Sequence, residues 1–109
     1  MDNKSVFSKA LFFFFFQFLI CEKASSQDFE SGNQLFQMYC NACHNQGSNL
    51  IIPEKNLYRK TLQTNGIFDL DAIIYQINNG KNGMPAFGDR LTELQIQKIS
   101  AFIMNEEFK

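Results

Sequence analysis

The chain has 109 residues, of which 45% are hydrophobic and 15% aromatic, and its formal net charge is -1. This length accommodates one small domain and excludes a multidomain enzyme. The near-neutral charge gives neither a basic footprint for nucleic acid nor an electrostatic attraction to anionic lipid.

Residues 1–26 are typical of a secretory leader. A segment with two lysines precedes the apolar block at 10–21, and small residues follow at the spacing of a signal-peptidase site. The block is shorter than the ~20 residues that span a bilayer. We therefore expect cleavage after Ser26, a mature domain over 27–109 and no permanent membrane anchor. An uncleaved anchor and a lipoprotein cysteine at Cys21 stay open as alternatives.

The first predicted helix of the remaining domain runs over about 29–41. Asp28 is placed to cap it, and its apolar side chains on or near one side are Phe29, Leu35, Phe36 and Tyr39. Gly32 lowers the helix propensity by about 1 kcal/mol relative to Ala. This cost points to a close helix crossing at Gly32, with plain tolerance of the glycine as the alternative.

Two further helices are predicted in the middle of the chain. Pro53 suits the first position of a helix that continues over 54–64 and stops at the Asn-Gly pair that follows. Asp69 caps the next segment, where apolar residues recur at helical spacing until Gly80 ends it.

The last third of the domain contains a loop and a helix. The segment KNGMPAFGD at 81–89 is rich in Gly and Pro, which predicts a loop. Thr92 and Gln95 form a capping box that opens the final helix, with Ile96, Ile99, Phe102 and Ile103 expected to face inward. The predicted fold class is all-α.

Cys40, Cys43 and His44 form the motif C-x-x-C-H, the attachment signature of c-type haem. Two thiols at this spacing reach the two vinyl groups on one edge of a porphyrin, and the adjacent histidine then lies under the iron. A structural zinc site needs about four protein ligands, which the chain does not offer in a recognisable arrangement. A redox-active dithiol and a plain disulfide stay open as alternatives.

The sixth position of the haem iron decides between electron transfer and ligand chemistry. Met84 lies in the Gly/Pro-rich loop and is followed by Pro85, which stiffens the backbone. We expect Met84 to be the second axial ligand. Met38 and Met104 lie within helical patterns and are expected to pack against the core.

Four segments give the chain a resemblance to the cytochrome c6 family. They are CNACH at 40–44, NLIIPEK at 49–55, IIYQINNGKNGMPAFGDRL at 73–91 and the C-terminal helix. The resemblance covers almost all of the predicted mature domain and implies a small class I cytochrome c fold, with about four helices around one covalently bound haem c.

The resemblance also implies a function and a location. The protein would be a soluble electron carrier rather than an enzyme, a monomer or weak oligomer in the thylakoid lumen of a plastid or cyanobacterium. It would take one electron from cytochrome f of the b6f complex and pass it to photosystem I. Three alternatives stay open: a periplasmic carrier that serves a terminal oxidase, a haem sensor or peroxidase in which the axial methionine dissociates, and a haem-free binding module.

Residue by residue, Cys40 and Cys43 match the family's thioether cysteines, and His44 and Met84 match its axial ligands. Gln76 matches a glutamine thought to tune the reduction potential. The remaining matches are Arg90, at the position of an arginine implicated in docking to photosystem I, and Gly32, Phe36 and Phe102, at the contact between the first and last helices.

Asp89 departs from the family pattern, which commonly has a second glycine after MPAFG. If the backbone there needs a positive φ, Asp is among the less costly replacements. Its negative charge beside Arg90 could also weaken the docking contact.

Overall fold

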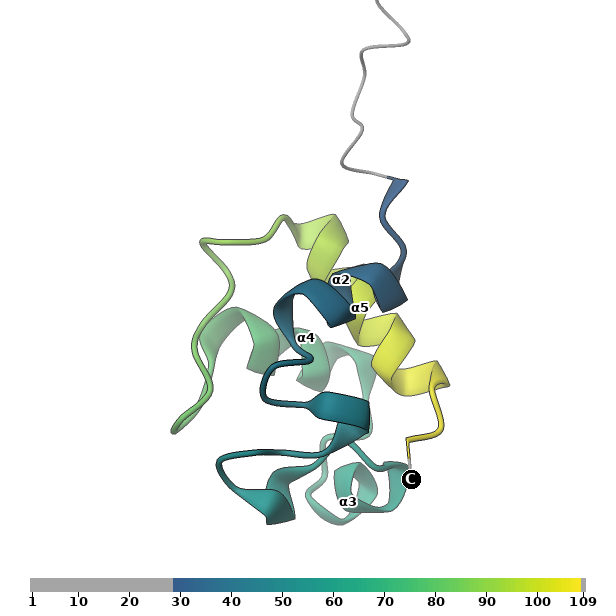
Figure 1. The fold of residues 1–109 in the computed structure, drawn as a ribbon, viewed down its shortest axis with the longest axis vertical. Helices are drawn as coiled ribbons and strands as arrows, with labels where there is room; N and C mark the ends of the chain where they lie inside the picture. Colours follow the sequence, from purple (N-terminus) through teal and green to yellow (C-terminus); the bar gives the residue numbers. More distant parts are fainter. Residues whose placement is uncertain (1–28, 109) are drawn as a thin grey trace, which may run out of the picture.

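The computed structural model describes residues 29–108 (Figure 1), so the predicted leader at 1–26 and its cleavage site lie outside the described residues. The described part contains four α-helices, two short 3-10 helices and a single bridge between Lys81 and Met84, and no strand. The predicted all-α class is confirmed. Across residues 29–108, no helix combines the length and the apolarity that a membrane crossing requires.

Helix α2 (Gly32–Tyr39) begins later than its apolar pattern predicts. Its N-cap is Ser31, whose hydroxyl accepts a hydrogen bond from the Gln34 backbone N–H at 3.1 Å, while the Gln34 side-chain oxygen accepts from the Ser31 N–H at 2.8 Å. This reciprocal pair satisfies two free N–H groups of the first turn. The predicted start at residue 29, with Asp28 as the cap, is therefore wrong; Asp28 itself lies outside the described residues.

The face that α2 buries is also narrower than predicted. Leu35 and Phe36 are fully buried, whereas Tyr39 is exposed and Phe29 is 86% exposed. Phe29 precedes the N-cap, so it does not share the face of the helix.

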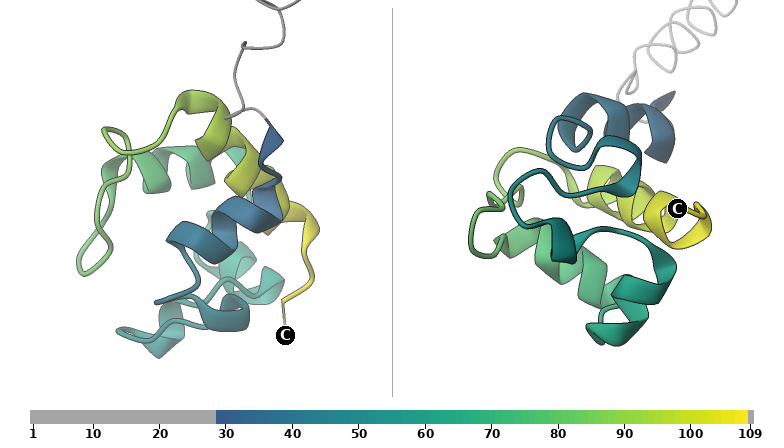
Figure 2. Two further views of the ribbon diagram at one scale, coloured as in Figure 1. Left: turned by 45° about the horizontal axis from the view of Figure 1, so that its top comes forward. Right: turned by 60° about the horizontal axis from the view of Figure 1, so that its bottom comes forward.

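The predicted close helix crossing is the contact of α2 with α5 (Glu93–Asn105), which lie across one another in Figure 2. A Cβ atom added at Gly32 would overlap the Lys98 carbonyl oxygen and lie 2.8 Å from the Cβ of Phe102. The rings of Phe36 and Phe102 meet with their centroids 5.3 Å apart. The capping box of α5 forms as predicted, with the Gln95 N–H donating to the Thr92 hydroxyl at 3.1 Å.

The helix predicted over 54–64 is two separate elements, η3 (Pro53–Lys55) and α3 (Arg59–Thr64). Asn56 divides them, because its backbone is extended and its side-chain oxygen accepts the Tyr58 N–H at 3.1 Å. Its amide group donates to the Pro53 carbonyl at 3.1 Å. Such local bonds of asparagine compete with helix formation.

Helix α4 (Leu70–Asn79) has the boundaries that its caps predict. The Asp69 carboxylate accepts the Ala72 N–H at 3.1 Å, and Gly80 ends the helix with a φ of 68°. Helices α2 and α4 both pack against α5, and a second short element, η2 (Asn45–Gly47), follows α2. The resulting core is Leu35, Phe36, Leu62, Ile73, Ile77, Phe87, Leu91, Ile96, Ile99 and Ile103.

The close helix crossing at Gly32 predicts that a larger side chain at this position destabilises the fold. Replacing Gly32 with Ala should lower the free energy of unfolding by about 1–3 kcal/mol, because the added methyl group overlaps a backbone atom that cannot move aside. Urea unfolding of the variant measures the change. Asn33→Ala, on the exposed side of the same helix, should stay within about 0.5 kcal/mol of the parent. Equal stability of the Gly32→Ala variant and the parent would contradict the crossing.

Candidate functional site

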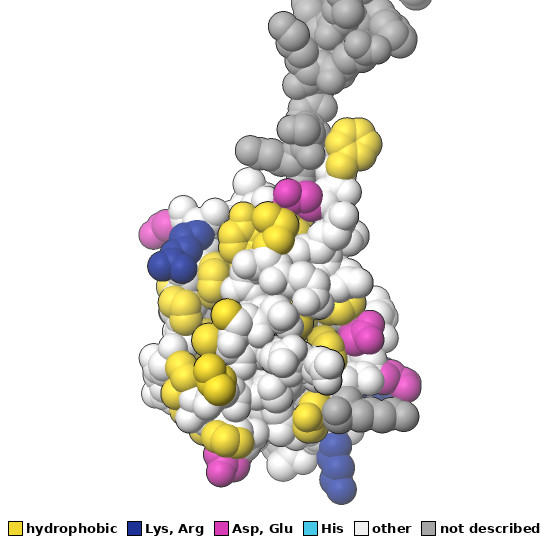
Figure 3. Space-filling view, viewed as in Figure 1, with side chains coloured by type: hydrophobic (Ala, Val, Ile, Leu, Met, Phe, Trp, Pro, Cys, Tyr) yellow, Lys and Arg dark blue, Asp and Glu magenta, His cyan; other side chains and the backbone are white. Residues whose placement is uncertain are grey.

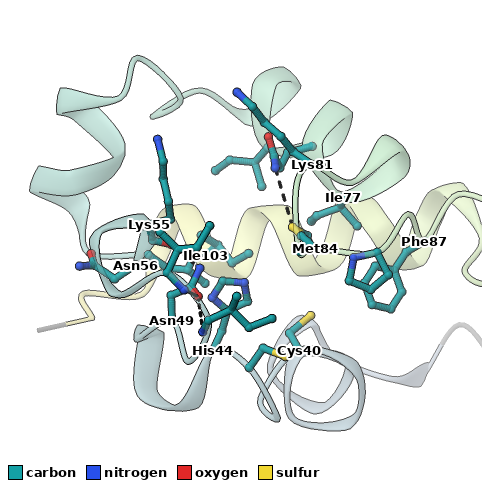
Figure 4. Close-up of a pocket in the computed structure, with 18 of the residues that line it drawn as sticks. Cys40, His44, Asn49, Lys55, Asn56, Ile77, Lys81, Met84, Phe87 and Ile103 are labelled. Atoms are coloured by element: carbon teal, nitrogen blue, oxygen red, sulfur yellow. Dashed lines mark hydrogen bonds between the residues drawn. The ribbon is translucent and has the colours of Figure 1, made fainter.

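A cavity of about 430 Å³ lies between the end of α2, the segment around η3, helix α4 and the loop after α4 (Figure 4). Its described lining is largely apolar and contains no Asp or Glu. Three cationic side chains also line it, Lys55, Lys81 and Arg90. The cavity therefore fits an apolar body that carries negative groups.

The C-x-x-C-H motif forms one tight turn at the end of α2. Cys40 is the C-cap of the helix and its N–H donates to the Phe36 carbonyl at 2.8 Å. The N–H of His44 in turn donates to the Cys40 carbonyl at 2.8 Å. This turn places the side chains of Cys40, Cys43 and His44 along the same wall of the cavity.

The imidazole of His44 is half-buried and fixed in orientation. Its Nδ1 lies 2.9 Å from the carbonyl oxygen of Ser48. A carbonyl only accepts hydrogen bonds, so Nδ1 carries the proton and Nε2 keeps a free lone pair. Burial lowers the pKa of His44, and the Ser48 carbonyl offsets part of this effect. The ring is therefore held as a neutral donor, the form in which histidine binds a metal.

The two cysteines are unpaired thiols in this structure. Burial raises the pKa of the Cys40 thiol to about 11, so it stays protonated at neutral pH. Within residues 29–108, no group of three or more His, Cys, Asp and Glu side chains lies together in a way that could hold a metal ion. The described residues thus offer no ligand set for the zinc alternative.

The loop after α4 holds Met84 at the opposite wall. Lys81 and Met84 exchange two backbone hydrogen bonds, of 3.1 and 2.9 Å, around a two-residue tip. Further along, the Phe87 N–H donates to the Ile77 carbonyl at 2.9 Å, which fastens the loop to the last turn of α4. Gly80 permits this approach, since an added Cβ would lie 2.5 Å from the Met84 carbonyl oxygen.

Met84 lies across the cavity from Cys40 and His44 in Figure 4. The Gln76 amide nitrogen on α4 lies 3.9 Å from the Met84 sulfur and donates a weak hydrogen bond to it. Met104 packs against the core as its helical position predicts. The same prediction for Met38 is wrong, because Met38 is 59% exposed at the cavity rim.

Arg90 and its neighbour Asp89 are both exposed at the end of the loop. The guanidinium carbon of Arg90 lies 5.4 Å from the centre of the Phe87 ring, which places the charge at the cavity rim. Among the described non-glycine residues, only Gln46 and Asn82 have a positive φ. Asp89 therefore does not occupy a backbone position that needs glycine.

One contact at the site was missed in the sequence. Gly47, with a φ of 84°, is buried under Phe108, and an added Cβ would overlap that ring. Phe108 also stacks on Phe36, with centroids 5.5 Å apart. The Gly47 N–H donates to the His44 carbonyl at 2.9 Å, so this contact covers the loop that follows the motif. The sequence carried one signal of this contact, a glycine three residues after His44. Its partner, Phe108, lies far away in the chain.

Comparison with known proteins agrees with this geometry. A family model described as cytochrome c oxidase, cbb3-type, subunit III matches residues 27–103. The cytochrome c6 of Bumilleriopsis filiformis is 43% identical over 79 residues, which is 72% of this chain and 92% of that protein. The cytochrome c6 of Alaria esculenta is 43% identical over 82 residues, covering 75% of this chain and 95% of that protein. The chain belongs to the cytochrome c6 family.

The fold supports the same assignment. The crystal structure of cytochrome c6 from the diatom Phaeodactylum tricornutum aligns with a TM-score of 0.65 at 41% identity, covering 67% of this chain and 86% of that one. A cytochrome c6 carries a covalently bound haem c with its iron and is an electron-transfer protein rather than an enzyme. The predictions of family, fold, cofactor and class of function are confirmed.

Proposed function

We propose that this cytochrome c6 passes single electrons from cytochrome f of the b6f complex to photosystem I in the thylakoid lumen. The observation that carries the proposal is the placement of two neutral donors, the His44 imidazole and the Met84 thioether, on opposite walls of one cavity beside two cysteines. The names and identities of the relatives support the same class of protein.

The side chains of the cavity fit a haem c. Cys40 and Cys43 would hold it by thioether bonds, and His44 and Met84 would be its axial ligands. Lys55 and Lys81 would balance the charge of its two propionates, because the described lining has no carboxylate of its own. When bound, the haem supplies an iron centre that cycles between the ferrous and ferric states.

The chain itself contributes two donor side chains, His44 and Met84, whose positions are fixed by hydrogen bonds. His44 is oriented by the Ser48 carbonyl, and Met84 by the paired backbone bonds of its loop. Two fixed protein donors leave no open position for a substrate, which favours electron transfer over catalysis or gas sensing. The largely apolar lining would also limit the access of water to a bound haem.

The assignment of Met84 is tested by Met84→Ala. The variant should lose the low-spin spectrum of the reduced protein, bind carbon monoxide, and have a midpoint potential lower by on the order of 100 mV or more, because a thioether ligand favours ferrous iron. Visible spectroscopy and redox titration measure these changes. Met38→Ala removes the other methionine of the cavity lining and should keep the low-spin reduced spectrum. A low-spin reduced spectrum that persists in Met84→Ala refutes the assignment.

Gln76 is proposed to tune the potential through the Met84 sulfur. Its amide N–H competes for the sulfur lone pair that the iron would use, which weakens donation and favours the reduced state. Gln76→Val should therefore lower the midpoint potential by about 40 mV, the equivalent of one hydrogen bond of ~1 kcal/mol in a one-electron couple. Gln97→Val, at an exposed position of α5, serves as the control. No difference between the two variants would exclude the role of Gln76.

The partner-facing surface is proposed to be the rim of the cavity. Hydrophobic side chains gather along the edge of the molecule where the loop after α4 lies (Figure 3), and Ile51 at the rim is 59% exposed. Residues 27–109 contain nine acidic and seven basic residues, so Arg90 is one of few cations available for docking. A small apolar contact with a charged border is typical of transient redox complexes.

Flash kinetics with isolated photosystem I test the proposed partner. Arg90→Gln should slow electron donation roughly two- to fivefold at low ionic strength and less at high salt, as for the loss of one exposed charge contact. Arg59→Gln is a matched control, because Arg59 also lies over a phenylalanine ring but outside the cavity. Rapid donation to a terminal oxidase with none to photosystem I would instead favour the alternative carrier.

Delivery to the lumen is proposed to depend on residues 1–26, with Gln27 as the first residue of the mature protein. The composition of that segment supports the proposal. Sequencing the N-terminus of the protein isolated from its source decides it, and a native chain that still begins at Met1 would contradict it.

A further inference from the structure

Three Asn-Gly pairs occur in the described part of the chain, at 65–66, 79–80 and 82–83. In such a pair the glycine backbone nitrogen can attack the asparagine side-chain carbonyl, since no glycine side chain hinders its approach. The attack requires that this N–H and the asparagine amide are both free to move. The structure therefore distinguishes the three pairs by their hydrogen bonds.

Two of the pairs are held in place. The Gly66 N–H donates to the Gln63 carbonyl at 3.1 Å, and the Gly80 N–H donates to the Gln76 carbonyl at 2.8 Å. Asn79 is further fixed as the last residue of α4, with its side-chain amide donating to the Tyr75 carbonyl at 2.9 Å. In both pairs a backbone hydrogen bond must open before the glycine nitrogen can react.

The third pair is different. Among the described residues, neither the Gly83 N–H nor the Asn82 side chain makes a hydrogen bond. Both residues are exposed at the tip of the two-residue turn between Lys81 and Met84. Asn82 also has a φ of 53°, a conformation that costs an L-residue energy and that glycine would adopt freely. The tip is thus the least restrained Asn-Gly pair in residues 29–108.

We propose that Asn82 is a site of spontaneous deamidation. The Gly83 nitrogen forms a bond to the Asn82 side-chain carbonyl carbon, the bond from that carbon to the amide nitrogen breaks, and the displaced proton leaves with ammonia. Water then opens the resulting cyclic imide at either carbonyl and gives aspartate or isoaspartate. The balance is one water consumed and one ammonia released, with no oxidant or cofactor.

Deamidation of Asn82 would change both the charge of the cavity and the geometry of the turn. Asn82 lines the cavity, whose described lining has three cationic side chains and no carboxylate, so either product places a negative charge there. Isoaspartate also adds a methylene group to the backbone of the turn. The turn has room for only two residues between Lys81 and Met84, so the lengthened form should lose their paired backbone bonds.

The experiment incubates the haem-loaded full chain at mildly alkaline pH and follows each Asn-Gly pair by peptide mass mapping. Asn82 should deamidate at least about fivefold faster than Asn65 and Asn79, because each of those must first open a backbone hydrogen bond. In concentrated urea the three pairs should react at similar rates. Gly83→Ala should slow the reaction at Asn82, and Asn82→Gly should abolish it while it keeps the positive φ.

Two results overturn the proposal. In the folded protein, Asn65 or Asn79 could react as fast as Asn82, or Asn82 could stay intact while the urea-unfolded chain is converted. The Asn82→Asp variant carries the new negative charge but keeps the normal backbone length. Comparing it with the isoaspartate form therefore isolates the effect of the added methylene group. Amide hydrogen exchange at Met84 should be faster in the isoaspartate form than in Asn82→Asp, and equal exchange in both would refute the effect on the turn.

Discussion

The crossing of α2 and α5 at Gly32 is the contact on which the rest of the structure depends. The missing side chain lets the two backbones approach closely, and the rings of Phe36 and Phe102 then meet one turn further along. Because α2 ends directly at Cys40, the angle of this crossing also determines where the cysteine turn points. A packing contact between two helices thus positions the residues proposed to hold the cofactor.

Helix α4 provides the complementary wall of the site. Its buried isoleucines pack on α5, while its last turn offers backbone carbonyls to the loop that carries Met84. Gln76 lies on the same helix and contacts the sulfur of that loop. One rigid element therefore sets the position of the methionine and a hydrogen bond to its sulfur. The cavity between the walls lies within the small core, so a cofactor bound there would also contribute packing.

Local signals in the sequence predicted the structure well where the interaction was local. The caps at Asp69, Gly80 and Thr92 were predicted correctly, because each satisfies backbone groups a few residues away. The division at Asn56 was missed, since a favourable proline start outweighed the competing side-chain bonds of the asparagine. The exposure of Met38 was missed because a helical pattern does not reveal which face a neighbouring element covers.

In the candidate site, too, the local features were predicted and the long-range contacts were not. The motif at Cys40–His44 and the loop position of Met84 were predicted from spacing and composition alone, and both line the cavity. The sequence did not predict the cationic lining or the packing of Phe108 over Gly47. Both features bring together segments that lie far apart in the chain. Tertiary packing, rather than residue type, decides such contacts.

The cover over the motif loop has a consequence for the order in which the protein folds. Phe108 follows α5, and it packs on the rings of Phe36 and Phe102 as well as over Gly47. This cover therefore cannot form until α5 has docked on α2. The loop after His44 is enclosed only after the helix crossing has formed, and it is exposed again whenever the end of α5 frays.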